Sequence, residues 1–203
     1  MCKKTMLCDK YTGPIIVICE GDSEKAYIQN INRILNYKKS YGALFKPITV
    51  NTGYFYEVKK KFRSEYKNNP KSSIIIWVDF DLYKRNDKDC LEIYKKKQGI
   101  PDFLFSCINF EDFLILHEKE NTVSKWIKLS GDHFKEPMHS DEYLSRFKLI
   151  KPNYKKGELA QPIDKSRFEM MLNNLESGKF YSNDFGKFLL DNIKHGYFEF
   201  NDR

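Results

Sequence analysis

The amino-acid sequence predicts an α/β fold, with a mainly parallel sheet of four strands flanked by helices and a C-terminal helical extension. Four short, mostly apolar runs alternate with segments of helical periodicity over about residues 12–120. This alternation is typical of parallel sheets, because each parallel connection needs a crossover, which is usually a helix. Residues 121–203 show only helical periodicity. We therefore expect an α/β core over residues 12–120 and a helical region over residues 121–203 that packs on it.

The first predicted strand is Pro14–Cys19, a continuous apolar run rich in β-branched residues. Such a run is typical of a strand that is buried on both faces. Asp22 or Ser23 can cap the helix that follows. Apolar residues then recur at helical spacing as far as Leu35, and we expect this helix to end near residues 40–42.

The second and third strands are predicted at Phe45–Val50 and Ser73–Val78, and the latter is the clearest strand pattern in the chain. A helix separates them, with an apolar face that begins at Phe55. This helix is expected to end before Pro70, because proline and its asparagine neighbours terminate helices.

A polar helix over Asp87–Gln98 precedes the fourth predicted strand, Phe103–Ile108. Helical spacing returns from Phe110 to His117, and the sequence leaves open whether His117 is a half-buried core residue or a catalytic one. Further helices are predicted at Val123–Leu129, Glu142–Leu149, Ser166–Leu175 and Asp184–Ile193.

The overall composition is that of a folded, basic protein. Hydrophobic residues make up 41% and the formal charge is +7, mostly from lysines in runs such as residues 59–61 and 95–97. These runs are either solvated helix faces or a surface that attracts nucleic acid. The chain has no apolar stretch of membrane-spanning length and no secretory signal pattern, so a cytoplasmic location is expected. The five cysteines are odd in number and widely spread, which predicts reduced, structural thiols.

Acidic residues follow three of the four predicted strands. Glu20 follows the first, Asp79 and Asp81 follow the third, and Glu111 lies just after the fourth. Because the carboxyl ends of parallel strands meet at one edge of a sheet, these side chains should converge there. Asp79 and Asp81 should also share one side, since side chains alternate along a strand.

Carboxylates that converge in this way repel one another, and a divalent cation removes the repulsion. Mg²⁺ or Mn²⁺ suits such a site, with Glu20, Asp79 and Asp81 as ligands. Glu20 could instead act as general base, and Glu111 as a further ligand. The alternatives are that these acids cap helices, complement a helix dipole or pair with lysines.

At these residues the chain resembles the RloB family, whose core is similar to a Toprim domain. Toprim domains pair a glutamate after the first strand with an Asp-x-Asp after a later one, and Glu20 matches the first and Asp79 with Asp81 the second. The resemblance implies that these acids bind Mg²⁺. It also implies a nuclease-like role in defence against phage or foreign DNA, together with an AAA-type or ABC-type ATPase partner.

Three longer segments extend the resemblance over most of the chain. Residues 20–27 look like the opening motif of the RloB family, and residues 110–117 look like its later motif, with Phe-Glu, an aromatic residue, an apolar run and His. Residues 151–156 resemble a looser Tyr-Lys element. The chain departs from the family where Phe80 fills a position that is often basic and where Asp112 replaces an apolar residue.

The lysines of the last segment can contact phosphate as point charges, so Tyr154, Lys155 and Lys156 are predicted to bind substrate, with a solvated loop as the alternative. The leading functional hypothesis is a metal-dependent nuclease that acts on DNA or RNA. Two alternatives remain: a nucleotidyl or glycosyl transferase that uses the Asp-x-Asp, and a catalytically quiet module that regulates an ATPase.

Overall fold

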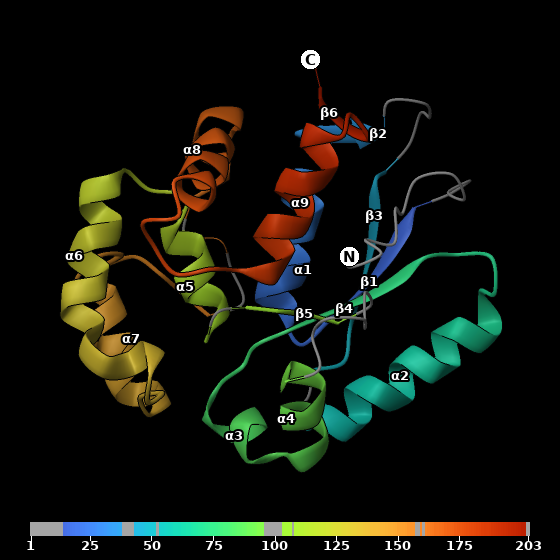
Figure 1. Ribbon diagram of the computed structural model, residues 1–203, viewed down its shortest axis with the longest axis horizontal. Helices are drawn as coiled ribbons and strands as arrows, with labels where there is room; N and C mark the ends of the chain where they lie inside the picture. Colours follow the sequence, from blue (N-terminus) through green and yellow to red (C-terminus); the bar gives the residue numbers. More distant parts are fainter. Residues whose placement is uncertain are drawn as a thin grey trace.

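The computed structural model describes residues 14–37, 43–51, 53–95, 103–106, 108–156, 159 and 161–201. Its centre is a four-stranded, fully parallel sheet in the order β3-β1-β4-β5 (Figure 1). The strands are β1 (Ile15–Cys19), β3 (Phe45–Thr49), β4 (Ile74–Val78) and β5 (Phe103–Phe105). The predicted fold class, a parallel α/β sheet with a C-terminal helical part, is therefore confirmed.

The register of the sheet aligns the ends of its central strands. Cys19, the last residue of β1, pairs with Thr49 of β3 and with Trp77 of β4. Every residue of β1 and β4 is buried, as expected for strands covered by helices on both faces. The residues that follow these strands therefore emerge together at the carboxyl edge.

Helices cover both faces of this sheet (Figure 1). Their bounds are α1 (Asp22–Ile31), α2 (Phe55–Asn68), α3 (Leu82–Asn86), α4 (Lys88–Lys95), α5 (Phe110–Ile115), α6 (Glu120–Ser130), α7 (Ser140–Lys148), α8 (Lys165–Glu176) and α9 (Asp184–Lys194). One face packs against α2 and α4 through residues such as Ile18, Val58 and Cys90. The other face carries α1, α5 and the C-terminal helices in a larger apolar cluster. In that cluster the Phe185 ring of α9 stacks on Trp77, with ring centroids 4.0 Å apart.

The first helix is shorter than its periodicity predicted. It ends at Ile31, and Leu35–Tyr37 forms strand β2, which pairs antiparallel with β6 (Phe198–Phe200). The Asn32 side chain donates to the Phe45 carbonyl and accepts from the Phe45 amide, both at 2.8 Å, and so fixes the turn beside β3. The prediction was wrong because the pairing partner of β2 lies at the far end of the chain.

Smaller corrections concern element boundaries. The predicted polar helix is preceded by the separate helix α3, and Asp87 lies between α3 and α4 and accepts from the Cys90 amide at 2.8 Å. Residues 96–98 of that prediction lie outside the described residues. The helix α1 begins after Gly21, without a side-chain cap from Asp22 or Ser23.

Two cysteines, Cys19 and Cys90, are described, and both are free and buried. They agree with the prediction of reduced, structural thiols; Cys2, Cys8 and Cys107 lie outside the described residues. Within the described part of the chain, the helices are all too short or too polar to cross a membrane.

His117 lies in the core. Its side chain is fully buried, Nδ1 lies 3.2 Å from the Phe113 carbonyl and Nε2 lies 2.9 Å from the Tyr27 hydroxyl. A carbonyl can only accept, so Nδ1 carries the proton and Nε2 accepts from Tyr27. Burial lowers the pKa of His117 to about 3. His117 is therefore a neutral structural residue.

The neutral state of His117 predicts an acid-dependent loss of stability. Unfolding lets the histidine take up a proton at its ordinary pKa of 6.5, whereas the folded protein resists protonation down to about pH 3. The contribution of His117 to stability is therefore complete well above pH 6.5 and falls as the pH drops through that value, by about 2 kcal/mol at pH 5. Urea unfolding of wild type and His117→Gln at pH 7.5 and pH 5 measures this effect. The free energy of unfolding should fall less between the two pH values in the variant than in wild type.

The exposed His195→Gln is the matched control and should track the wild type at both pH values. Equal pH dependence in wild type and His117→Gln would contradict the assignment of a buried neutral imidazole.

Candidate functional site

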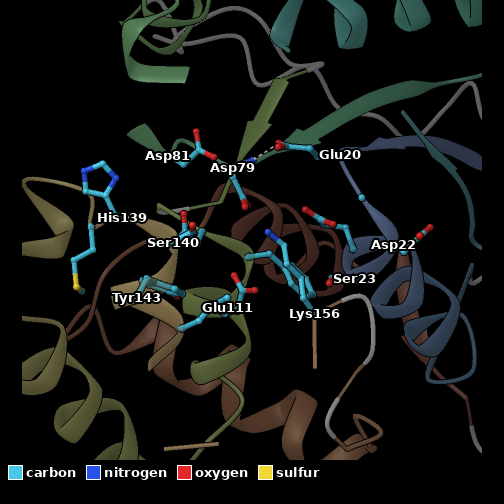
Figure 2. A pocket seen from close by; sticks show the side chains of 16 residues that line it. Glu20, Asp22, Ser23, Asp79, Asp81, Glu111, His139, Ser140, Tyr143 and Lys156 are labelled. Atoms are coloured by element: carbon cyan, nitrogen blue, oxygen red, sulfur yellow. Dashed lines mark hydrogen bonds between the residues drawn. The ribbon is translucent and has the colours of Figure 1, made fainter. Parts of the chain in front are cut away.

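A cavity of about 470 Å³ opens at the carboxyl edge of the sheet. Its walls come from the end of β1 and the start of α1, from the segment after β4, from the start of α5 and from the beginning of α7. Figure 2 shows Glu20, Asp79 and Asp81 along one side, and Glu111, Ser23 and Lys156 on the opposite side. The cavity therefore lies where the parallel topology predicts a ligand site.

The four acids expected to converge all line this cavity. Glu20 Oε2 accepts from the backbone amide of Asp79 at 3.4 Å, a contact drawn in Figure 2. Asp81 Oδ1 accepts from the Lys84 amide at 3.2 Å and so caps α3. Asp81 therefore caps a helix, which is one of the alternatives that the sequence left open, and it also lines the cavity.

Lys84 was not predicted as a site residue, although its side chain is only 1% exposed and reaches this cluster. Its Nζ lies 2.7 Å from Glu20 Oε1, 2.6 Å from Glu20 Oε2 and 3.5 Å from Asp81 Oδ2. Burial alone would lower the pKa of Lys84, but the charges of Glu20 and Asp81 outweigh it and raise the pKa above its usual value. Lys84 is therefore a permanent cation between two of the expected metal ligands.

Asp79 forms no ion pair with a residue that the structure describes, although the positive charge of Lys84 acts to lower its pKa. Its Oδ1 is buried and has no hydrogen-bond partner among the described residues. Burial raises the pKa of Asp79 well above its ordinary value, and the negative charges of Glu24 and Glu20 raise it further. An unpaired buried carboxylate is costly, and such groups mark sites where a ligand supplies the missing charge.

Glu24, which the sequence did not single out as a site residue, belongs to the same cluster. The side chain is 4% exposed and lines the cavity. Burial, followed by the charge of Glu20, raises the pKa of Glu24 to about 7. Its position in the first turn of the helix that leaves β1 was the available signal, because that turn faces the carboxyl edge of the sheet.

Glu111 lies at the start of α5 and lines the same cavity as Asp79 and Glu24. Tyr154 donates its hydroxyl to Glu111 Oε1 at 2.7 Å. Burial raises the pKa of Glu111, while the Tyr154 hydrogen bond and the positive charge of Lys156 act in the opposite direction. The cavity is therefore lined by six carboxylates rather than the predicted four, and Asp22 and Glu24 are the additions.

The three predicted substrate contacts take different positions. Tyr154 is 3% exposed and lies behind Glu111, where it orients that carboxylate. Lys156 lines the cavity, and Figure 2 shows its amine directed toward the space between Asp79 and Glu111. Lys155 is exposed and is not among the residues that line the cavity.

The position of Tyr154 gives a prediction about metal affinity. Removing the hydroxyl in Tyr154→Phe leaves Glu111 without the hydrogen bond that favours its charged form, so divalent cations should bind about 10-fold more weakly. Calorimetric titration with Mn²⁺ checks this. The exposed Tyr56→Phe is the control and should leave the affinity unchanged. Unchanged affinity in Tyr154→Phe would show that Glu111 takes no part in cation binding.

The wall opposite the sheet is organised by Asp112, which is completely buried. Its Oδ1 accepts from Trp126 Nε1 at 2.9 Å and from the Tyr143 hydroxyl at 3.0 Å. Its Oδ2 accepts from the Asn109 amide at 3.0 Å and lies 3.2 Å from His133 Nε2. The residue that departs from the RloB-like pattern therefore joins α5 to α6, to α7 and to the turn at Gly131–Phe134.

The acids fit a divalent cation chemically, but they are not yet arranged around one position. Among the described residues, no three His, Cys, Asp or Glu side chains are already grouped as metal ligands. Glu20 and Asp81 are turned toward Lys84, and Glu111 toward Tyr154. A cation would give Asp79 Oδ1 the partner that it lacks among the described residues, and it would favour the charged form of Glu24, whose pKa is raised without it.

Comparisons with protein-family models, curated proteins and solved structures give no match for this chain. The geometry of the cavity and the chemistry of its side chains are therefore the features that indicate a function.

Proposed function

We propose that this chain is a Mg²⁺- or Mn²⁺-dependent nuclease of Toprim type that hydrolyses phosphodiester bonds in nucleic acid. One observation carries the proposal: the buried Oδ1 of Asp79 has no hydrogen-bond partner among the described residues, and it lies in a cavity lined by five further acids. A site of this kind gains stability from a divalent cation, and oxygen ligands are those that Mg²⁺ prefers.

Asp79, Glu24 and Glu111 are the side chains that would hold the cation. When bound, such a cation polarises a phosphoryl oxygen and lowers the pKa of a bound water. Tyr154 keeps Glu111 oriented, and Lys84 keeps Glu20 oriented beside Asp79. These supporting contacts fix the acids before substrate arrives, which reduces the reorganisation needed for reaction.

A lysine at the cavity favours a phosphate substrate over a neutral one. Lys156 lies at the cavity and carries an amine that can contact a phosphate oxygen. The cavity volume of about 470 Å³ is within the range of sites that take a small molecule or a nucleotide. The defence role and the ATPase partner implied by the RloB resemblance are part of the same proposal.

The test is cleavage of end-labelled single- and double-stranded DNA, RNA and tRNA by the purified chain, with Mg²⁺, Mn²⁺ or EDTA. We expect cleavage of at least one nucleic acid with metal and none with EDTA. Glu24→Gln should reduce the rate about 100-fold, whereas the exposed Glu169→Gln should not.

Cleavage that persists in EDTA would refute the metal-dependent mechanism. Absence of both Mn²⁺ binding and cleavage would favour the quiet regulatory module, and a stable complex of Glu24→Gln with an ATPase would agree with that alternative.

A further inference from the structure

We propose that the Lys84 ammonium takes the place of one divalent cation, so that this acidic site binds a single divalent ion rather than two. This inference rests on the proposed metal-dependent function. It divides the acidic side chains of the site into two halves, each with its own cation. Glu20 and Asp81 form one half with Lys84 as their fixed cation. Asp79, Glu24 and Glu111 form the other half, which takes the divalent ion.

The contacts of Lys84 are those of a bound cation. Nζ touches both carboxylate oxygens of Glu20 at 2.7 and 2.6 Å, and it lies 3.5 Å from Asp81 Oδ2. Its three protons can each meet an acidic oxygen. A divalent ion placed between Glu20 and Asp81 would occupy the same space and would repel the ammonium.

Lys84 is not free to leave this position. The side chain is 1% exposed, and the backbone amide of the same residue donates to Asp81 Oδ1 at 3.2 Å. The residue is therefore tied to Asp81 at both its backbone and its amine. Displacing the amine without moving α3 would leave a buried ammonium without its carboxylates, and breaking a buried ion pair in this way is strongly unfavourable.

The charges of the other half point to one ion. Asp79 Oδ1 has no hydrogen-bond partner in the part of the chain that the structure describes, and Glu24 is the acid whose charge acts most strongly on Asp79. Glu111 adds a third negative charge, opposed by Lys156. One divalent cation together with Lys156 balances these three carboxylates. The half that contains Lys84 keeps a single net negative charge, which is too little to hold a second divalent ion tightly.

The experiment is a count of bound Mn²⁺, made by the EPR signal of free Mn²⁺ and by calorimetry at protein concentrations above the dissociation constant. Wild type should bind one Mn²⁺ per chain. Lys84→Met keeps the apolar length of the side chain and removes the charge, so it should bind two. The exposed Lys125→Met is the matched control and should bind one.

Two further variants keep the test decisive if Lys84→Met does not fold. Glu20→Gln should still bind one Mn²⁺, because Glu20 belongs to the half with Lys84, whereas Asp79→Asn should bind none. Circular dichroism establishes that each variant is folded.

Each remaining outcome has one meaning. Two Mn²⁺ in wild type, one in folded Lys84→Met, or none in folded Glu20→Gln would overturn the assignment of Lys84 while leaving the proposed nuclease intact. No Mn²⁺ binding by wild type would overturn the proposed function as well.

Discussion

Replacing Asp79 by asparagine should abolish cleavage and at the same time make the metal-free protein more stable. The asparagine keeps the shape of the side chain but removes a buried negative charge that Glu24 and Glu20 repel. In EDTA at pH 8 we expect a gain of about 1–2 kcal/mol, with a melting temperature several degrees higher. Cleavage should fall by about 100-fold or more, because the proposed ligand is lost.

The pH dependence of the stability gained by Asp79→Asn follows from the direction in which folding shifts the pKa of Asp79. Asp79 has a raised pKa in the folded protein, so its ionised form opposes folding only above the ordinary pKa of 3.8. The advantage of Asp79→Asn should therefore be larger at pH 8 than at pH 5. Thermal melts of wild type, Asp79→Asn and the exposed control Asp141→Asn, with EDTA and with Mn²⁺, measure both effects.

Mn²⁺ should raise the melting temperature of wild type and of the control but not that of Asp79→Asn, because a ligand stabilises only the state that binds it. A lower melting temperature for Asp79→Asn in EDTA would mean that the carboxylate has a stabilising partner. Undiminished cleavage would remove Asp79 from the catalytic site.

The largest loss of stability is expected from Asp112→Ala. The substitution removes the acceptor of three buried donors, from Trp126, Tyr143 and His133, and of the part-buried Asn109 amide. A buried donor left unsatisfied costs about 1–3 kcal/mol, and these losses overlap, so we expect a decrease of about 4 kcal/mol in the free energy of unfolding. Urea unfolding followed by tryptophan fluorescence measures it.

The control is Asp132→Ala on the neighbouring turn, where the carboxylate is 80% exposed and pairs only with Lys135 among the contacts described. Exposed ion pairs contribute at most about 1 kcal/mol, so this variant should unfold almost as wild type does. Equal effects of the two substitutions would contradict the role of Asp112 as the polar centre of this wall.

The strands and their order of appearance were predictable because their signal is local. A strand that is covered on both faces must be apolar at nearly every position, and Ile15–Cys19 and Ile74–Val78 carry that pattern without interruption. The convergence of Glu20, Asp79 and Asp81 followed from the same argument, since parallel strands deliver the next residues to a common edge.

The helix boundaries were less predictable because a competing partner lies elsewhere in the chain. Leu35 continues the helical spacing of α1, yet it pairs with Phe200 in a second, two-stranded sheet. Periodicity reports which side of an element is apolar, but it does not report whether a distant strand offers hydrogen bonds to the same backbone.

By itself the sequence determined the parallel sheet and the edge at which its acids gather, because both depend on apolar patterning and chain direction. Only the tertiary structure decided how the acids are paired. Lys84 meets Glu20 across 64 residues and Tyr154 meets Glu111 across 43. Such pairs depend on which buried charges come within reach of one another after folding, and a buried charge takes whichever partner the packing brings to it.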